Sequence, residues 1–413
     1  MNQADSEGIV AELAARGLAS ADDHKSADVV IINSCTVTHR SDADVRKLVA
    51  RVHRENPGAK VVITGCYAQR DPDALVKIKG TSAVVGHSNA HELGDVVAKL
   101  VKEAPTEPII LRGDLDDLPP LSATAVAHDR TRPFVKIQDG CDARCTYCVI
   151  PSVRGPARSA PPEQVLDSIA KLIARGDQEI VLTGVHLGKY PAFVDLVKSA
   201  LALPGLKRLR LSSIEPMAFD KELVTLARDD ARLAPHFHLP LQSGSDRVLK
   251  RMNRPYRSRD FAEIVRHIRA ELPDACIGTD VITGFPGETD EEAQASAEMI
   301  ATVDYAHVFS YSDRPGVPST RLPDKIDPAT IKARAAISQR ASDASWARFL
   351  DRFVGRELEV LTLQSPPGVT HALSPHYCPV HIAGEIAPNT QLSVRVERRD
   401  GARLTAAVRP AAP

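Results

Sequence analysis

The chain has 413 residues, of which 43% are hydrophobic and 25% are charged, and its formal net charge is −1. This length and composition predict a globular protein of two or three domains. A near-neutral total excludes a protein that binds nucleic acid through bulk positive charge, so any such site must be local. No apolar run reaches the ~18 residues that a membrane span needs, and the first residues, MNQADSEG, contain neither a basic leader nor an apolar stretch. We therefore expect a cytoplasmic protein without a membrane partner.

The first part of the chain, residues 1–104, alternates helical and strand patterns. Helices are expected at 6–16, around 45–52 and at 91–102, and strands at 28–32, 60–64 and, more weakly, 83–85. This alternation predicts a parallel sheet with helices packed on it. The unit opens on a helix, whereas a sheet built from right-handed crossovers starts on a strand. We therefore expect that a leading strand is absent from the sequence as written.

Residues 105–133 are rich in Pro, Asp and Ala and weakly periodic, which predicts a linker. Within residues 134–345, six strand-like runs alternate with helical segments and predict an incomplete TIM-like barrel, (β/α)6. The runs are 134–137, 179–182, 208–211, 236–239, 277–282 and 306–309. A helix is expected at 328–350. The tail, residues 346–413, has short alternating segments broken by Pro and Gly and predicts a small β-barrel.

Seven cysteines, an odd number, are scattered in a way that does not suggest a disulfide framework. Three of them fall within eight residues as C-x3-C-x2-C: Cys141, Cys145 and Cys148. An electron-carrying [4Fe–4S] cluster usually takes four thiolates, and a structural zinc site closes with four ligands. Three thiolates would instead leave one iron of a four-iron cluster open. A zinc knuckle completed by a distant residue, or three unrelated thiols, remain alternatives at this point.

Two further cysteines follow predicted strands of the first part. Cys35 ends the run Val29–Cys35, and Cys66 ends the run Val61–Cys66. Because ligands of open α/β sheets collect at the carboxyl ends of the strands, two thiols there can share a metal. The alternative is that each is an ordinary buried cysteine.

These motifs, in this order, resemble the radical S-adenosylmethionine (SAM) methylthiotransferases, which modify tRNA adenosine or a ribosomal protein. The resemblance covers nearly the whole chain. It is carried by Asn33-Ser34-Cys35-Thr36-Val37-Thr38, Thr64-Gly65-Cys66-Tyr67-Ala68-Gln69, the cysteine triplet with Tyr147, Leu239–Ser245, Met252-Asn253-Arg254, Gly278-Thr279-Asp280 and Gly284–Thr289. Two segments, Leu182–Gly188 and Leu211–Pro216, resemble the branch that acts on threonylcarbamoyladenosine beside the tRNA anticodon. The same chemistry on isopentenyladenosine in tRNA or on a ribosomal protein is the alternative, although those branches carry different sequences in these segments. The tail is similar to the family's RNA-binding TRAM barrel.

The resemblance implies two [4Fe–4S] clusters and SAM as cofactors. One cluster would be held by the triplet and would cleave SAM to a 5′-deoxyadenosyl radical. The auxiliary cluster would use Cys35 and Cys66, and its methylthio group would be transferred to adenine C2. Expected SAM contacts, each of which has turn or packing chemistry as its alternative, are Tyr147, Gly184, Gln242, Gly284 and Glu288. The implied partners are a tRNA anticodon stem-loop and an electron donor such as flavodoxin or ferredoxin; the sulfur donor is not indicated.

One departure from the family pattern concerns the auxiliary cluster. Relatives begin with a strand that ends in Gly-Cys-Lys, and its cysteine would lie two residues before Met1. Neither Cys276 nor Cys378 is an obvious substitute ligand. The expectation is a start codon assigned too late, and a non-catalytic iron–sulfur or zinc RNA-binding protein stays open as an alternative function.

Basic residues are concentrated locally although the whole chain is neutral. Residues 130–270 contain 24 Lys and Arg against 15 Asp and Glu. Six basic residues form one short run: Arg247, Lys250, Arg251, Arg254, Arg257 and Arg259. This run predicts a phosphate-contacting surface, with a solvated helix face as the alternative. Aromatic residues make up only 4% of the chain, so no broad base-stacking platform is expected.

Overall fold

The computed structural model describes residues 1–36, 39–103, 106–123 and 131–408. The chain divides into two compact units, each assembled from segments that are distant in sequence. Unit 1 comprises Met1–Ala127, Gln138–Ser159 and Ser312–Thr320, and unit 2 comprises His128–Ile137, Ala160–Tyr311 and Arg321–Pro413. The units therefore do not follow the linear boundaries expected from the sequence, because the cysteine triplet and residues 312–320 belong to the same unit as the N-terminal sheet.

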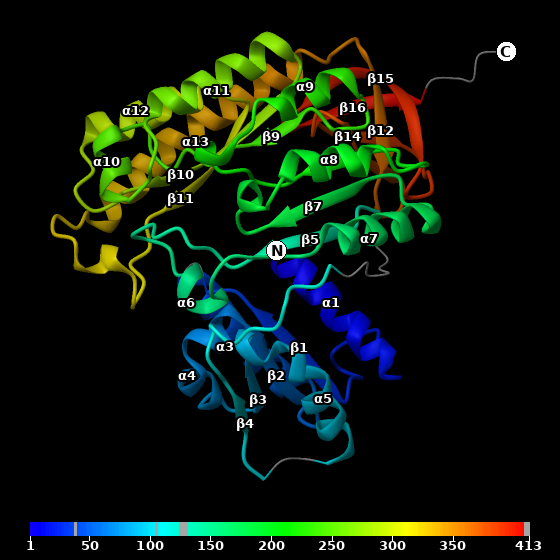
Figure 1. The fold of residues 1–413 in the computed structure, drawn as a ribbon, viewed down its shortest axis with the longest axis vertical. Coiled ribbons are helices and arrows are strands. Elements are labelled where there is room, and N and C mark those ends of the chain that lie inside the picture. Colours follow the sequence, from blue (N-terminus) through cyan, green and yellow to red (C-terminus); the bar gives the residue numbers. More distant parts are fainter. Residues whose placement is uncertain (37–38, 104–105, 124–130, 409–413) are drawn as a thin grey trace. The chain divides into compact units, whose positions relative to one another are not determined.

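Unit 1 is built on a four-stranded parallel sheet in the order β1-β2-β3-β4 (Figure 1). The strands are β1 (Val29–Ser34), β2 (Lys60–Gly65), β3 (Thr81–Gly86) and β4 (Ile109–Leu111). The helices are α1 (Asn2–Ala15), α2 (His39–Glu55), α3 (Cys66–Arg70), α4 (Pro72–Val76) and α5 (Leu93–Lys102), and η1 (His87–Glu92) is a short 3₁₀ segment. The parallel α/β architecture expected for this part is confirmed.

Both faces of this sheet are covered by apolar helix faces. On one face, Val49 of α2 packs with Val61 and Ile63 of β2. On the other face, Val62 of β2 packs with Val97 of α5, and α1 adds apolar side chains to the same cluster. Successive residues of β2 therefore enter opposite clusters, which is the two-residue period of a strand buried on both sides.

The structure differs from the expected linker in one respect: Ile109–Leu111 forms β4 and pairs in parallel with β3. Three apolar residues bounded by polar and proline residues are too short to show a period in the sequence. Pairing with an exposed strand edge, rather than local propensity, defines this strand.

The six barrel strands and the helices between them follow the predicted alternation. The strands are β5 (Phe134–Asp139), β7 (Ile180–Gly184), β8 (Leu209–Leu211), β9 (His236–His238), β10 (Cys276–Thr283) and β11 (Tyr305–Ser310). β5, β7 and β8 are consecutive in one sheet, β9, β10 and β11 in another, and a parallel bridge joins Leu209 to Leu233 just before β9. The strand pairs β7–β8, β9–β10 and β10–β11 are parallel, which confirms an open barrel of the radical SAM type.

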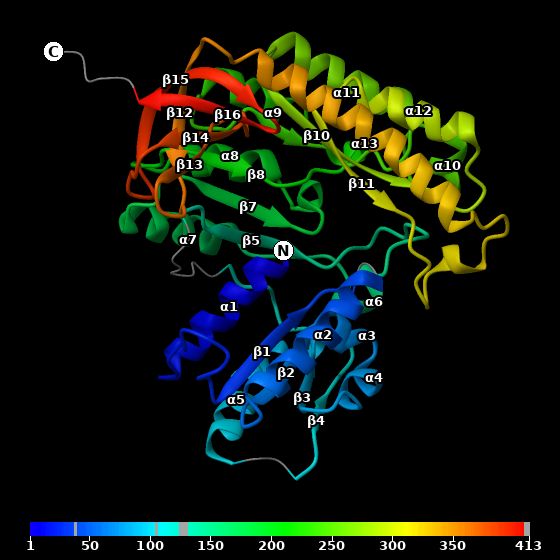
Figure 2. The same cartoon turned by 180° about the vertical axis from the view of Figure 1, so that it is seen from behind.

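Helices cover one face of these strands. They are α7 (Pro162–Arg175), α8 (Phe193–Leu201), α9 (Glu222–Asp229), α10 (Asp246–Arg251), α11 (Ser258–Glu271), α12 (Asp290–Ile300) and α13 (Pro328–Asp351), with 3₁₀ segments η2 (Leu187–Lys189) and η3 (Pro216–Ala218). Figures 1 and 2 show α11, α12 and α13 along the β9–β11 sheet. Ser342 of α13 exchanges hydrogen bonds with the backbone of Ala306, so this helix packs directly on β11.

The tail of unit 2 closes into a five-stranded barrel, as expected from its alternating segments. Its strands are β12 (Glu357–Thr362), β13 (Val369–Leu373), β14 (Pro379–Ala383), β15 (Gln391–Asp400) and β16 (Arg403–Val408), in the order β12-β13-β14-β16-β15. Phe349 and Phe353 from the end of α13 pack into the apolar core of this barrel. None of the helices in the described part of the chain is both long and apolar enough to cross a membrane.

The remaining elements of unit 1 are short. α6 (Ile150–Arg154) and β6 (Arg158–Ser159) follow the cysteine triplet, and β6 pairs with the last two residues of β5, Gln138 and Asp139. A 3₁₀ segment, η4 (Pro318–Arg321), closes the residues 312–320 that return to this unit.

Candidate active site

The cysteine triplet lies on a loop between β5 and α6, and none of its three cysteines forms a disulfide bond. The loop is a folded structure: the Cys141 N–H donates to the carbonyl of Gly155 over 3.1 Å, and the Cys148 N–H donates to the carbonyl of Cys145 over 3.1 Å. The backbone N–H of Ala143 points at the Cys141 sulfur, 3.4 Å away. An N–H directed at sulfur stabilises a thiolate, so this donor set fits the three-thiolate iron site that the sequence predicts.

Gly140 makes the entry to this loop possible. Its φ is +70°, and a Cβ at this position would lie 1.9 Å from the backbone oxygen of Pro156. Backbone cannot move aside as a flexible side chain can, so only glycine allows the two strands of the loop to approach so closely.

The second pair of cysteines lies at one edge of the unit 1 sheet. Ser34 at the end of β1 is in register with Gly65 at the end of β2, so Cys35 and Cys66 leave the sheet side by side. Burial raises the pKa of the Cys66 thiol, the Arg154 guanidinium opposes this rise, and the nearby Cys35 adds to it. Two thiols that influence one another electrostatically, beside a guanidinium, fit a site that binds metal through thiolates.

Arg154 connects the two cysteine sets within unit 1. It ends α6, six residues after Cys148, and is only 3% exposed. Its Nη1 donates to Oδ1 of Asp139 over 2.9 Å, and its Nη2 donates to Oδ2 of Asp5 over 2.7 Å. Burial disfavours the charged guanidinium, but Cys66, Asp5 and Asp139 outweigh it and raise the pKa of Arg154 well above its usual value. The cation therefore remains charged beside Cys66.

Apolar contacts join the same two regions. Cys66 clusters with Val149 and Val153 of the segment after the triplet, and Val317 of the returning segment completes the group. The Ser319 N–H donates to the carbonyl of Thr146 inside the cysteine loop over 2.9 Å. The sequence did not predict these contacts, because they bring together three segments separated by more than sixty positions.

The predicted SAM contacts are divided between the units. Tyr147, a half-buried side chain, lies in the cysteine loop of unit 1, and the other four residues belong to unit 2. Gly184 is the last residue of β7. Gln242 follows β9, is bridged to Val281 of β10, and has a φ of +67°, a conformation that costs free energy in a non-glycine residue and concentrates at functional sites.

Gly284 and Glu288 form one buried turn after β10. The Gly284 N–H donates to Oε2 of Glu288 over 2.8 Å, and the same oxygen accepts from Nη1 of Arg334 over 3.1 Å. Burial raises the pKa of Glu288 although Arg334 opposes the rise. The other oxygen, Oε1, is buried and has no hydrogen-bond partner in the described part of the chain. A buried carboxylate oxygen without a donor is costly, so this atom fits a ligand that brings an N–H or O–H group.

Sequence reasoning missed a polar cluster on the barrel strands of unit 2: His238 on β9, Asp280 on β10 and His307 on β11. Burial opposes ionisation of Asp280, but His238 and His307 lower the pKa of its carboxyl to about 2. Gly278-Thr279-Asp280 was recognised as a family motif. The two histidines could not be assigned to the same cluster from the sequence, because their proximity depends on the register of the three strands.

An aromatic cluster was also missed. His236 of β9 stacks on Tyr377 with ring centroids 4.2 Å apart, and Tyr305 of β11 stacks on Tyr377 at 5.8 Å. Burial lowers the pKa of His236 well below its usual value, so this ring is neutral. Few aromatic residues are present overall, but here they collect where the C-terminal barrel meets the barrel strands of unit 2.

The run of six basic residues divides between interior and surface. Arg254 is buried and paired with Glu215, and Arg247 pairs with Glu292 over 2.5 Å. Of the other four members, Arg251 is half-buried beside Asp324, and Lys250, Arg257 and Arg259 are exposed. Several members line one shallow pocket with Asn253 and Tyr256. The phosphate-contacting surface expected from the sequence is therefore smaller than the count of basic residues suggests.

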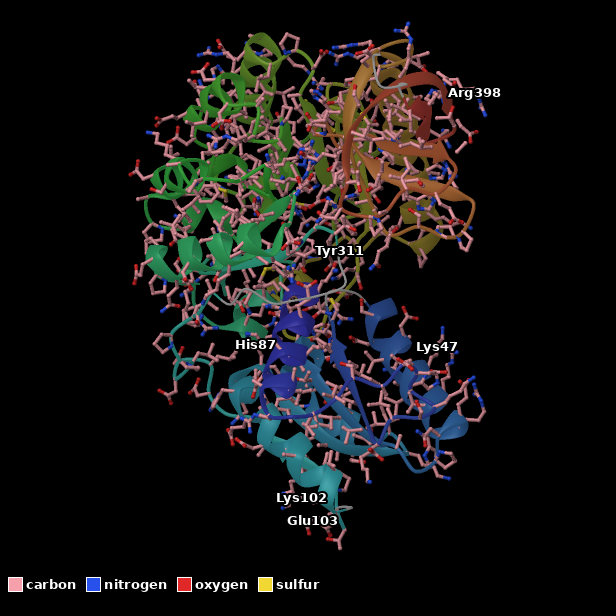
Figure 3. All side chains as sticks on the ribbon, turned by 90° about the vertical axis from the view of Figure 1, so that its right-hand side faces the viewer. Lys47, His87, Lys102, Glu103, Tyr311 and Arg398 are labelled. Carbon is pink, nitrogen blue, oxygen red and sulfur yellow. The ribbon has the colours of Figure 1, made fainter. Side chains whose placement is uncertain are left out.

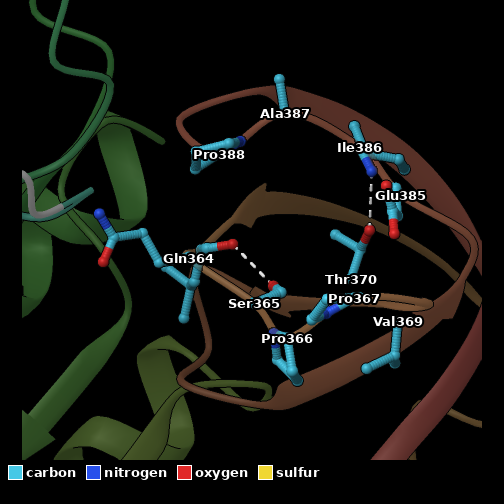
Figure 4. Close-up of a pocket in the computed structure, with 11 residues that line it drawn as sticks. Gln364, Ser365, Pro366, Pro367, Val369, Thr370, Glu385, Ile386, Ala387 and Pro388 are labelled. Atoms are coloured by element: carbon cyan, nitrogen blue, oxygen red, sulfur yellow. Dashed lines mark hydrogen bonds between the residues drawn. The ribbon is translucent and has the colours of Figure 1, made fainter.

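The C-terminal barrel has its own hollow, between the loops after β12 and after β14 (Figure 4). Its lining is largely apolar and proline-rich, and Glu385 is the one titratable side chain in it. Exposed basic side chains lie elsewhere on this barrel; Arg398 of β15 is an example (Figure 3). The hollow lacks the thiols, histidines and cations that the chemistry would need.

Comparisons with known proteins agree with this geometry. The model of the radical SAM superfamily matches residues 135–300, and that of the uncharacterized protein family UPF0004 matches residues 1–86. The fold is similar to that of a radical S-adenosylmethionine methyltransferase, TsrM, from Kitasatospora setae, with a TM-score of 0.55 and 18% identity over 70% of this chain and 65% of that one. The open barrel and the cysteine loop thus define a radical SAM enzyme.

Relatives in sequence narrow the class from radical SAM enzymes to methylthiotransferases. The chain is 34% identical to a threonylcarbamoyladenosine tRNA methylthiotransferase, MtaB, of Aquifex aeolicus, over 88% of this chain and 90% of the relative. It is 35% identical to the protein of the same name from Thermotoga maritima, over 87% and 84%. It is 33% identical to a tRNA-2-methylthio-N(6)-dimethylallyladenosine synthase of Nocardioides sp., over 96% and 84%. The chain belongs to the radical SAM methylthiotransferase family, as its motifs predicted.

Proposed function

We propose that this protein attaches a methylthio group to C2 of N6-threonylcarbamoyladenosine in tRNA, at the adenosine 3′ of the anticodon. The observation that carries the chemistry is the presence of both cysteine sets, Cys35 with Cys66 and the triplet, in one compact unit tied by Arg154. The choice of substrate is supported by four relatives named for threonylcarbamoyladenosine, each 34–35% identical to the chain.

Each predicted residue has a role in this proposal. Cys141, Cys145 and Cys148 hold a [4Fe–4S] cluster, and Cys35 and Cys66 supply thiolates to an auxiliary cluster. Bound there, the clusters and SAM would supply the radical chemistry that an unactivated adenine carbon requires. Residues proposed to contact SAM are Tyr147, Gly184, Gln242, Gly284 and Glu288.

The chain's own groups prepare these sites. The Ala143 N–H stabilises the Cys141 thiolate, and the buried guanidinium of Arg154 offsets negative charge beside Cys66. The Oε1 atom of Glu288, which receives no hydrogen bond in the described part of the chain, accepts one from an amino or hydroxyl group of the ligand. These interactions orient the ligand and compensate the charge of the thiolates. The bond-breaking step is left to the cofactors.

The proposed partners are a tRNA anticodon stem-loop and an electron donor such as flavodoxin or ferredoxin. Lys250, Arg257 and Arg259 form the exposed part of the basic run, and phosphate contacts of this kind position RNA without reading its bases. The five-stranded barrel is proposed as a TRAM-like second contact. An enzyme that acts on an adenine must take the base out of its stack.

The test is mass spectrometry of tRNA nucleosides from a strain that lacks methylthiolation of both adenosine types. Expression of this chain should restore 2-methylthio-N6-threonylcarbamoyladenosine. Cys145→Ala should abolish both this product and anaerobic cleavage of SAM to 5′-deoxyadenosine. Cys378→Ala, which removes a buried thiol of the C-terminal barrel, is the matched control and should retain them.

Three other outcomes would redirect the proposal. Restoration of only 2-methylthio-N6-dimethylallyladenosine would assign the dimethylallyl-modified adenosine as the substrate. Relatives of 30–33% identity are named for that product. A methylthiolated ribosomal protein without a modified nucleoside would assign the protein substrate. Absence of SAM cleavage by a cluster-loaded protein would refute catalysis and leave an RNA-binding role.

A further inference from the structure

Three side chains of metal-ligating types lie together on the barrel strands of unit 2, whereas the two cysteine sets belong to unit 1. Asp280 of β10 is in register with His307 of β11, and Gly278 of β10 is in register with His238 of β9. Because residues two apart point to the same face of a strand, all three side chains share one face. Their ligand atoms lie within 4.8 Å of one another.

The distances between these atoms are those found around a metal ion. His307 Nδ1 lies 3.1 Å from Asp280 Oδ1, and His238 Nε2 lies 3.3 Å from the same oxygen. Two ligands bonded to zinc at 2.0–2.1 Å in a tetrahedron are about 3.3 Å apart. Two of the three separations thus match those around a metal ion, and the third, between the two ring nitrogens, is at most 4.8 Å.

The orientation of His238 is the second observation. This histidine is 7% exposed, and its Nδ1 lies 2.9 Å from the Ser213 hydroxyl. Its Nε2 is directed at the cluster but makes no hydrogen bond in the described part of the chain, despite its nearness to Asp280. Metal-bound histidines usually donate the N–H of their other ring nitrogen to an oxygen acceptor, and the Ser213 hydroxyl oxygen can take this part here.

The cluster is also accessible. The His307 side chain is 55% exposed, whereas Asp280 is 22% exposed, so a hydrated ion can approach from the side of β11. On the neighbouring residue of β11, Ala306, the backbone N–H is bonded to Ser342 of α13. Three protein ligands with an open side leave coordination positions for water or for an oxygen ligand.

We propose that His238, Asp280 and His307 form a mononuclear site for a divalent first-row transition metal. Two imidazoles and one carboxylate suit zinc and ferrous iron, and they contain none of the sulfur that the cysteine sites offer. The open coordination positions of the metal would be filled by oxygen atoms. A small ligand with a carboxylate group can fill two neighbouring positions at once. The site is independent of the substrate proposed above.

The experiment uses the full-length protein with its iron–sulfur clusters loaded. One equivalent of zinc chloride is added, unbound zinc is removed by desalting, and the retained zinc is measured by elemental analysis and by X-ray absorption at the zinc edge, where iron does not interfere. The expected result is one zinc per chain, surrounded by nitrogen and oxygen at about 2.0–2.1 Å, with imidazole scattering and no sulfur shell at about 2.3 Å.

Two variants test the assignment, and a third is the matched control. Asp280→Asn preserves the side-chain volume and His307→Ala changes an exposed position; each should lose at least nine-tenths of the retained zinc. His371→Ala removes a histidine of another ring pair, stacked on His381 in the C-terminal barrel, and should retain it. Iron content and the fluorescence of Trp346, equal to those of the unchanged protein, establish that each variant is folded.

Three results would overturn the proposal. The first is that the unchanged protein retains no zinc. The second is that the retained zinc is bound through sulfur. The third is that zinc with nitrogen and oxygen ligands persists in both Asp280→Asn and His307→Ala. In each case the cluster is an ion-paired structural group, and the proposed methylthiotransferase activity is unaffected, because the measurement uses neither SAM nor RNA.

Discussion

The strongest stability prediction concerns Glu179, at the start of β7. Its carboxylate is fully buried among three arginines: it accepts from Arg210 Nε over 2.7 Å, Arg208 Nη1 over 3.2 Å and Arg132 Nη1 over 3.3 Å. Arg210 also donates to the carbonyls of Ser374 and Pro375 in the C-terminal barrel. We predict that Glu179→Gln destabilises the whole of unit 2 and not only β7.

The pKa of Glu179 gives the magnitude. Burial raises the pKa, but Arg210, Arg132 and Arg208 outweigh burial and lower it from 4.5 to about 2. At about 1.4 kcal/mol per pH unit, this difference is worth about 3 kcal/mol of folding free energy. Because the folded-state pKa is the lower one, the contribution is complete above pH 4.5 and is lost as the pH falls toward 2. Glutamine retains the shape but removes the carboxylate charge from the buried guanidinium of Arg210, which costs about 3–5 kcal/mol for a buried pair, whereas Arg208 keeps its ion pair with Glu359.

The assay is urea unfolding at pH 7, followed by the fluorescence of Trp346, the one tryptophan of the chain. This residue donates to the carbonyl of Ala402 in the C-terminal barrel over 2.9 Å, so its signal reports on unit 2. Glu397→Gln, at an exposed position of β15, is the matched control and should change the unfolding free energy by less than about 0.5 kcal/mol. A loss below about 1 kcal/mol for Glu179→Gln would show that the network contributes no net stability.

Three further predictions concern the cysteine loop and the buried thiols. Gly140→Ala should abolish iron retention by the triplet, measured by elemental analysis. Gly176→Ala is the control, because this residue also has a positive φ but has open space around its Cβ. It should lower the free energy of unfolding by about 1 kcal/mol and retain the iron. Burial raises the pKa of Cys378 to about 12, so its alkylation by iodoacetamide at pH 8 should be at least a hundredfold slower in native than in urea-unfolded protein, and equal rates would contradict its burial. Arg154→Met should lower stability by about 3–5 kcal/mol because the carboxylate of Asp139 is left buried without its cation; an unchanged melting curve by circular dichroism would refute that pairing.

The sequence predicted the elements whose signal is local. Buried runs such as Val61–Gly65 specify strands wherever they occur, and helical periodicity specified the helices between them. The placement of Cys35 and Cys66 at matching strand ends followed from the parallel sheet alone. β4 was missed because three residues carry no period, and its pairing depends on the edge that β3 presents.

The sequence could not predict groups assembled by tertiary structure. His238, Asp280 and His307 come from three strands, and their shared face depends on a register that no local pattern specifies. Arg314 is a second example: it returns to unit 1 and, buried at 1% exposure, donates to Asp42 over 3.0 Å. Its position in a loop between a barrel strand and a helix gave no indication of that partner.

Charge burial explains why the two cysteine sets belong to one unit. A guanidinium as deeply buried as that of Arg154 is tolerated only when anions surround it, and its neighbours are Asp5 of α1, Asp139 before the triplet and Cys66 after β2. Each anion comes from a different segment, so the pairing requires the triplet loop to fold onto the N-terminal sheet. Thiolates added by metal binding would increase the negative charge around Arg154 and strengthen that association. If the clusters bind as proposed, the same cation that organises the loop would couple occupation of either cysteine site to the stability of unit 1.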